Sequence, residues 1–375
     1  MPVFLILFST LFFFLNGCGQ KEQTQKKQIA GIFDLKKNLP IFMSNGEEIF
    51  FHSLEKEKGK KIFSLQGKKN IKHSFCHSPT QAIQYENKIF VSCSLSHKIL
   101  ILKAENFSFL GTIWFQDKAS PQIMAIDPKT QQLFVSGYNT NSLYWISLQE
   151  KNFGQILHKE NLLPSKKCST QCLARPSGVL VFKNFLIVAL SNLHKNYNLS
   201  QSPNGEIAIF EIESKKLYKR EETSYKNAVN LLIAQEKLYV ANRGDYTTKG
   251  SLDIFTTSSW TKEKTIELKG FFPVKGIEIS PKTLLWTTIP AGIITLNLET
   301  QNIQKINLAK YLCPQKKPYP YSMVNDVARI QNKVFLLEFN TQCLLEFSLD
   351  SQGNVSFPPS PYSLPSSPAF IWRGK

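Results

Sequence analysis

The sequence predicts an all-β protein, a seven-bladed β-propeller that follows an N-terminal export signal. The 375 residues are 42% hydrophobic, which is enough apolar material for a large core. After residue 28, short β-branched and aromatic runs alternate with Asn, Gly, Lys and Pro, and no sustained run has helical spacing. Seven copies of an apolar strand ending in small polar residues recur about every 40 to 50 residues, the period of a propeller blade.

The first residues have the features of a signal peptide. Residues 3–15 form an apolar run that is shorter than the roughly 20 residues of a membrane-spanning helix and suits a signal peptide's hydrophobic region. The run ends in Leu15-Asn16-Gly17-Cys18, which resembles the lipobox of bacterial lipoproteins. The alternative is a plain secretory signal followed by an ordinary cysteine.

The resemblance to lipoproteins implies that the protein is located in the bacterial cell envelope. Residues 1–17 would be removed, and Cys18 would carry a diacylglycerol and an N-acyl chain that anchor the protein to a membrane. Residues 18–28 are polar and would form a tether. Gly19 after the cysteine favours the outer membrane over the inner one. We expect no cofactor besides this covalent lipid.

Residues 29–375 are predicted to form a single domain of four-stranded blades. A first strand often begins after Pro, as at Pro79, Pro121, Pro176 and Pro273, because a strand start tolerates the missing N–H. The second strand carries the repeat's anchor, and the seven anchors are Phe50, Phe90, Phe134, Ile187, Tyr239, Trp286 and Phe335. Further apolar runs, such as residues 99–102 and 143–146, supply the third strand, and a weaker fourth follows.

Two copies of the repeat resemble a known family. Residues 133–137 (LFVSG) and 238–242 (LYVAN) look like the YVTN-type repeat of secreted bacterial propellers, and the resemblance covers about four of the seven units. Phe50 and Trp286 mark poorer copies. Eight blades are therefore the alternative, although we expect residues 362–372 to supply a closing strand and not another unit.

Long connections are expected on one face of the propeller. Within antiparallel blades, connections from the second to the third strand share a face with those from the fourth strand to the next blade; we call it the loop-rich face. The longest segments predicted there are residues 162–174, 192–204, 242–250 and 309–321. Long loops on a rigid scaffold are common binding surfaces, so we expect a partner to bind there.

Six cysteines besides Cys18 fall on this face, an even set in an oxidising compartment. Chain proximity favours three disulfides: Cys76–Cys93, Cys168–Cys172 and Cys313–Cys343. Zinc is the alternative, because His73, Cys76, His77, Cys93 and His97 have suitable ligand types, but their spacing matches no standard finger. We assign no metal site.

Candidate ligand-binding residues lie at the starts of the first strands, around the axis on the loop-rich face, or in a loop on that face. Arginine holds planar anions through a two-pronged fork, and the chain has only five arginines. Arg175 could equally pack on the carbonyls of a neighbouring blade. The candidate binding residues are Arg175, Asn227, Arg243, Lys275, Asn325 and Asp326.

These observations favour a binding protein over an enzyme. The chain lacks G-x-S-x-G, H-E-x-x-H, P-loop, G-x-G-x-x-G and EF-hand patterns, and we assign no catalytic residue. The net charge of +17 suits an envelope protein or an anionic polymer as partner, and export makes nucleic acid an unsuitable one. We expect a monomeric, non-catalytic scaffold. The alternative is a small-molecule enzyme, a lactonase-like metal-dependent hydrolase in which Asp326, Asn325 and Asn227 bind a cation at the axis.

Overall fold

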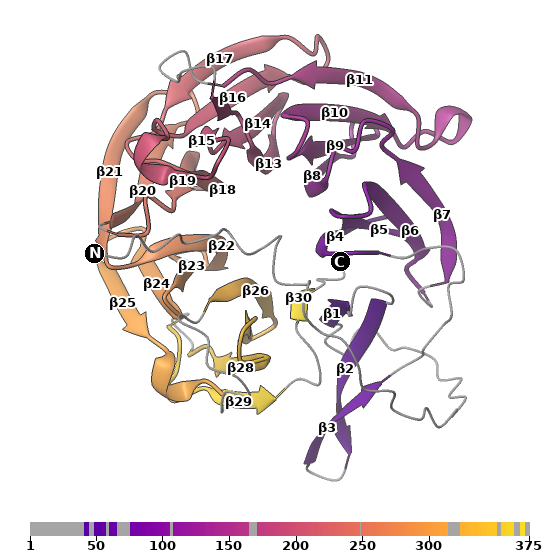
Figure 1. Cartoon of the computed structure of the whole chain (residues 1–375). Coiled ribbons are helices and arrows are strands. Elements are labelled where there is room, and N and C mark those ends of the chain that lie inside the picture. The colour runs from indigo at the N-terminus through magenta and orange to yellow at the C-terminus, as the bar shows by residue number, and fades with distance from the viewer. Residues whose placement is uncertain are drawn as a thin grey trace.

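The computed structural model describes most of the chain after residue 40. The described residues are 41–44, 49–57, 60–65, 76–105, 108–164, 171–247, 249–313, 323–350, 354–363 and 368–371. Their strands form seven four-stranded antiparallel sheets around a central axis, as Figure 1 shows. Each sheet is one blade, so the prediction of an all-β propeller with seven blades is confirmed for this part of the chain.

The strands of the first four blades follow one another from the axis outward. Blade 1 consists of β30 (Pro368–Ile371), β1 (Ile41–Ser44), β2 (Ile49–Glu57) and β3 (Lys60–Leu65). Blade 2 consists of β4 (Pro79–Tyr85), β5 (Lys88–Cys93), β6 (Lys98–Lys103) and β7 (Phe109–Trp114). Blade 3 consists of β8 (Pro121–Asp127), β9 (Gln132–Gly137), β10 (Ser142–Ser147) and β11 (Ile156–Asn161). Blade 4 consists of β13 (Pro176–Phe182), β14 (Phe185–Leu190), β16 (Glu206–Glu211) and β17 (Leu217–Glu222).

The remaining three blades follow the same order. Blade 5 consists of β18 (Ala228–Ala234), β19 (Lys237–Asn242), β20 (Lys249–Thr256) and β21 (Lys262–Lys269). Blade 6 consists of β22 (Phe272–Ser280), β23 (Thr283–Ile289), β24 (Gly292–Asn297) and β25 (Ile303–Asn307). Blade 7 consists of β26 (Val324–Ile330), β27 (Lys333–Glu338), β28 (Cys343–Ser348) and β29 (Ser360–Ser363).

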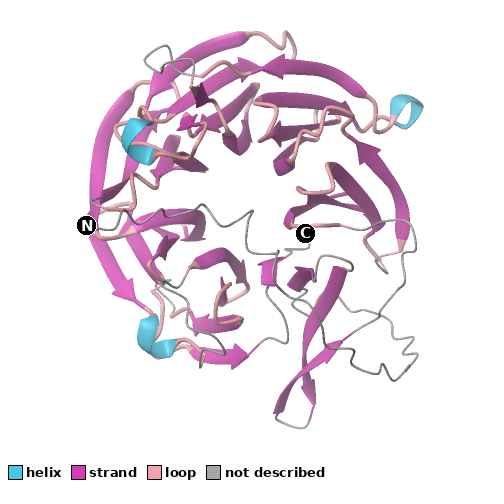
Figure 2. Ribbon diagram, viewed as in Figure 1, coloured by secondary structure: helices cyan, strands magenta, loops and turns pink. Residues whose placement is uncertain are grey.

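Few other elements occur in the described ranges. The helical segments there are three short 3-10 turns, η1 (Glu150–Asn152), η2 (Leu199–Gln201) and η3 (Ala309–Tyr311), drawn in cyan in Figure 2. A two-stranded sheet pairs β12 (Cys172–Leu173) with β15 (Leu193–His194). Among the residues that the structure describes, no helix has the length and apolar character needed to cross a membrane.

The C-terminal strand closes the ring. β30 pairs with β1, so blade 1 is built from both ends of the chain. The innermost strands contact one another around the axis in the order β4, β8, β13, β18, β22, β26, β30 and back to β4. The prediction that residues 362–372 supply a closing strand therefore holds for β30. One anchor was placed wrongly: Phe50 lies in the third strand of its blade, whereas the other six anchors lie in second strands. The reason is that the C-terminus supplies this blade's first strand, and β1 is its second.

The core consists of apolar layers between neighbouring blades. One layer joins blades 2 and 3 and contains Leu133 and Val135, and the next joins blades 3 and 4 and contains Phe134. Successive residues of a strand point to opposite faces, so β9 contributes to both layers. This double burial explains why the second strands read as continuous apolar runs and show no alternation with polar residues.

The small polar residue after the anchor has a structural role in several blades. The first strand of blades 2 to 7 shifts register near its start. In three blades, a hydroxyl from the second strand accepts a hydrogen bond from the backbone N–H inside this irregularity. The pairs are Ser92 with Gln81 N at 3.0 Å, Ser136 with Ile123 N at 3.0 Å, and Thr287 with Lys275 N at 3.2 Å. The irregular backbone therefore keeps its donors satisfied.

Candidate functional site

The long connections meet on the loop-rich face, as the antiparallel blades require. The β12–β15 sheet joins the segment before blade 4 to the long connection between β14 and β16. The Lys226 ammonium, just before blade 5, donates to the carbonyls of Leu199 (2.6 Å) and Ser200 (2.9 Å) in that connection. The carbonyl of Lys226 in turn accepts from Gly244 N at 3.0 Å, in the connection of blade 5. Residues 192–204 and 243–247 are thus linked into one surface.

Two of the three predicted disulfides are present. Cys76 is bonded to Cys93 with a Cα–Cα distance of 4.9 Å, and Cys313 is bonded to Cys343 with a Cα–Cα distance of 5.5 Å. Cys172 is also disulfide-bonded, and its predicted partner Cys168 lies outside the described residues, as does the predicted lipidation site Cys18.

The alternative zinc site loses its sulfur ligands. Because Cys76 and Cys93 are oxidised to a disulfide, neither can act as a thiolate. His97 Nδ1 accepts a hydrogen bond from Ser120 N at 3.2 Å, and His73 lies outside the described residues. In the part of the chain that the structure describes, no group of three or more His, Cys, Asp or Glu side chains could hold a metal ion.

Arg175 occupies a repeated and conformationally demanding position. The residue before the first strand has a positive φ in four consecutive blades, and these residues are Ser78 (53°), Ser120 (55°), Arg175 (49°) and Asn227 (62°). Asn tolerates the left-handed region better than most residues, and serine is small, whereas arginine is bulky. Blade 4 therefore places a long cationic side chain where its neighbours have short polar ones.

The Arg175 side chain is held between two aromatic rings. Its guanidinium carbon lies 4.8 Å from the ring centre of Tyr138 and 5.2 Å from that of Tyr197. Its Nη1 donates to the Tyr138 carbonyl at 3.3 Å and to Asn139 Oδ1 at 3.1 Å. The residue is only 8% exposed, and its buried Nε has no hydrogen-bond partner. Arg175 therefore packs on a carbonyl of the neighbouring blade, as one of the two expectations had it. Only one edge of its guanidinium binds protein in this way, and the other edge does not.

Arg243 and Asn227 form a second part of the same face. Arg243 N donates to the Asn227 carbonyl at 3.0 Å. Arg243 Nη1 and Asn227 Nδ2 each lie 3.5 Å from the hydroxyl of Tyr246, whose ring packs edge-on against Phe272. The buried Nε of Arg243 also has no hydrogen-bond partner. Gly244 is required here, because a Cβ on it would lie 1.9 Å from the Lys249 carbonyl oxygen.

Tyr138 connects the two parts electrostatically. Burial raises the pKa of its hydroxyl well above the ordinary value, Tyr197 and Tyr246 raise it further, and Arg175 and Arg243 lower it. All four side chains therefore influence the pKa of the Tyr138 hydroxyl. We call Arg175, Arg243, Tyr138, Tyr197 and Tyr246 the arginine–tyrosine cluster.

The three other candidate residues lie on blades 6 and 7. Lys275 on β22 forms an ion pair with Asp326 on β26, whose side chain is only 1% exposed. Asn325 is the neighbour of Asp326 on the same strand. Asn227 instead contacts Tyr246 and Arg243. A cation bound by Asp326 would have to displace the Lys275 ammonium, and this ion pair gives the lactonase-like alternative no support.

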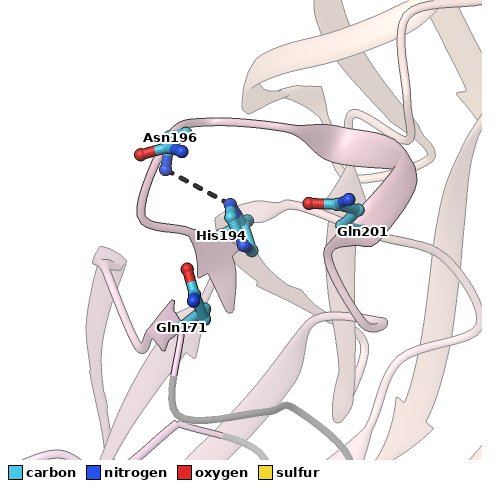
Figure 3. A pocket seen from close by; sticks show the side chains of 4 residues that line it. All are labelled: Gln171, His194, Asn196 and Gln201. Atoms are coloured by element: carbon cyan, nitrogen blue, oxygen red, sulfur yellow. Dashed lines mark hydrogen bonds between the residues drawn. The ribbon is translucent and has the colours of Figure 1, made fainter.

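An open pocket lies beside the cluster, on the β12–β15 sheet. It encloses about 630 Å³ and is lined by Gln171, His194, Asn196 and Gln201. Figure 3 shows His194 between the two glutamine side chains, and His194 Nδ1 accepts a hydrogen bond from Asn196 N at 3.3 Å. The described residues of its lining are all polar.

The tyrosines of the cluster were not predicted from the sequence. Tyr138 and Arg243 occupy equivalent positions, the first residue after the second strand, where each N–H binds the carbonyl of the positive-φ residue of its blade: Tyr138 N to Ser120 O at 3.2 Å, and Arg243 N to Asn227 O at 3.0 Å. An alignment of the repeats at this position would have indicated that both side chains face the same end of the propeller. Tyr197 and Tyr246 lie in loops of unequal length, for which the repeat gives no register.

Comparisons with known proteins agree with the architecture. No protein-family model matches the chain, and no curated protein does. A solved protein from Lactobacillus plantarum is similar to it with a TM-score of 0.64 and 9% identity, over 89% of this chain and 98% of that one. Kuenenia stuttgartiensis hydrazine synthase is similar with a TM-score of 0.62 and 10% identity, over 82% and 92%. The WD40 repeats of RRP9 give a TM-score of 0.57 at 11% identity, over 78% and 83%. At such low identities, the similarities show that the chain has a β-propeller fold.

Proposed function

We propose that this protein is a lipid-anchored β-propeller of the bacterial cell envelope that binds a protein or an anionic polymer through its loop-rich face, without catalysing a reaction. The observation that carries the proposal is the arginine–tyrosine cluster. It collects two of the chain's five arginines on the face where the long connections meet. Among the described residues, neither guanidinium forms an ion pair with a carboxylate.

The supporting scaffold suits binding. The first strands are held together around the axis by hydrogen bonds between blades, for example from Met124 N to Gln81 Oε1 (2.5 Å) and from Gly276 N to Asn230 Oδ1 (3.0 Å). Disulfides hold two of the connections on the loop-rich face. A rigid platform loses little conformational entropy when a partner binds, and long loops on it provide the contact surface. The anchor and the envelope location rest on the lipobox at Cys18.

The test compares partner capture by variants of the two faces. The full-length protein is used to capture partners from native envelopes, and captured proteins and polymers are identified by mass spectrometry and by glycan and phosphate analysis. In one variant, residues 195–201 are replaced by a short Gly-Ser linker, with folding checked by circular dichroism. The control variant changes Lys88 and Lys129 to Ala on the opposite face. We expect the linker variant to lose a partner that the control retains. The opposite pattern, or no partner that depends on either face, would contradict the proposal.

A further inference from the structure

The two arginines of the cluster share an unusual hydrogen-bonding state. Each uses Nη1 for contacts within the protein, whereas Nε has no partner and is buried. Nε and Nη2 form one edge of a guanidinium, and this edge can bind a carboxylate through two parallel hydrogen bonds. A buried donor without a partner is costly, so a ligand oxygen placed there would gain more than at a solvated arginine.

The aromatic rings hold these guanidinium groups in place before any ligand arrives. Arg175 is stacked between Tyr138 and Tyr197, and Arg243 is tied to the hydroxyl of Tyr246. An arginine fixed in this way loses little rotamer freedom when it binds an anion. The rings of Tyr138 and Tyr197 also restrict the orientation of the Arg175 guanidinium.

The composition of the cluster favours a polypeptide over a phosphate polymer. Tyrosine and arginine are the residues most enriched at the energetic centres of protein interfaces. A phosphate polymer is generally bound by flexible surface cations that follow its backbone, whereas this cluster is partly buried and aromatic. Tyr246 extends the aromatic surface to Phe272 of blade 6.

We propose that the arginine–tyrosine cluster is a recognition site for the carboxylates of an acidic polypeptide segment, with the Nε and Nη2 edges of Arg175 and Arg243 as the donors. The inference rests on the proposed function and names the chemistry of the partner. Tyr138, Tyr197 and Tyr246 act as positioning residues that hold the two guanidinium groups and provide apolar surface for the segment beside the acidic residues.

The test measures binding of two polyanions to the purified full-length protein. Fluorescently labelled poly-L-glutamate represents an acidic polypeptide, and labelled inorganic polyphosphate represents a phosphate polymer. The variants are Arg175→Lys, which keeps the charge but loses the fork, and Arg243→Ala. Arg329→Ala is the matched control, because it removes one positive charge from an exposed residue whose Nε binds the Gln331 carbonyl near the first turn of blade 7, on the opposite face.

We expect Arg175→Lys and Arg243→Ala each to weaken poly-L-glutamate binding about ten- to a hundredfold, the loss that goes with charge-assisted hydrogen bonds. Arg329→Ala should change it less than about twofold, since a single exposed charge contributes little. Unchanged binding by Arg175→Lys, with equally weakened binding by Arg243→Ala and Arg329→Ala, would overturn the inference, because binding would then follow net charge alone. Polyphosphate binding that depends on both arginines, with poly-L-glutamate binding that does not, would overturn the carboxylate assignment.

Failure of this inference can be distinguished from failure of the proposed function. If capture from envelopes depends on residues 195–201 but neither arginine affects poly-L-glutamate binding, the loop-rich face binds a partner and the cluster does not recognise carboxylates. Thermal unfolding of each variant accompanies the binding measurement. Since Arg175 is buried, a poorly folded Arg175→Lys would be set aside, and Arg243→Ala, at a more exposed position, then decides the outcome.

Discussion

The ion pair of Lys275 and Asp326 allows a quantitative test of how the innermost strands are held together. Asp326 is 1% exposed and Lys275 is 30% exposed, and the two side chains join blades 6 and 7. Removing one partner of a buried pair typically costs about 3 to 5 kcal/mol, because the remaining charge is left buried without compensation. Lys275 keeps some contact with water, so we expect Lys275→Met to lower the free energy of unfolding by about 2 to 4 kcal/mol.

The assay is urea unfolding monitored by fluorescence and circular dichroism. Lys282→Met is the matched control, because Lys282 pairs with Glu299 at 2.9 Å while the two side chains are 60% and 56% exposed. This exposed pair should contribute less than about 1 kcal/mol. The double variant Lys275→Met/Asp326→Asn should be more stable than Lys275→Met alone, since the amide that replaces the carboxylate carries no charge to desolvate.

Two results would refute this reasoning. A cost for Lys275→Met no larger than that for Lys282→Met would mean that the pair is effectively solvated. A double variant as unstable as Lys275→Met would mean that the lost packing of the lysine stem, and not the loss of the ammonium beside the carboxylate, causes the effect.

Three further predictions concern other parts of the chain. Gly276→Ala should lower the free energy of unfolding by about 1 to 3 kcal/mol, because the new Cβ would lie 2.3 Å from Nε1 of the fully buried Trp286. The control Gly111→Ala, whose new Cβ would have Ile101 Cδ1 as its nearest neighbour at 4.0 Å, should be within about 0.5 kcal/mol of wild type in the same urea titration. Equal effects of the two substitutions would contradict the explanation by packing. Replacing both Cys313 and Cys343 by Ser opens a loop of sequence separation 30 and should cost about 3 to 4 kcal/mol; unchanged stability under oxidising conditions would exclude this stabilising role. Cys18→Ser should abolish fatty-acid labelling and release the protein from the membrane fraction, and normal labelling of this variant would refute the lipoprotein assignment.

Much of the loop-rich face could be predicted from the order of residues along the chain. The pairs Cys76–Cys93 and Cys313–Cys343 were predictable because each closes a short loop, with separations of 17 and 30 residues, at the same end of one blade or of two neighbouring ones. Arg175 and Arg243 could be assigned to the loop-rich face because antiparallel strands fix the end at which each connection leaves. Their contacts with Tyr138, Tyr197 and Tyr246 could not be predicted, because these depend on the conformations of irregular loops and on distances between blades.

The sequence by itself determined the strands and their repeat, because these depend on local patterns. Phe134 and its neighbours Leu133 and Val135 show that a second strand is apolar on both sides, and the recurrence of this pattern predicts a ring of blades. Only the tertiary structure decided which distant residues meet. Closure of the ring pairs β30 with β1, which moved Phe50 to a third strand, and brings Asp326 to Lys275 and Arg175 between the rings of Tyr138 and Tyr197. Such contacts depend on the curvature of the whole ring, to which every blade contributes, so no local segment encodes them.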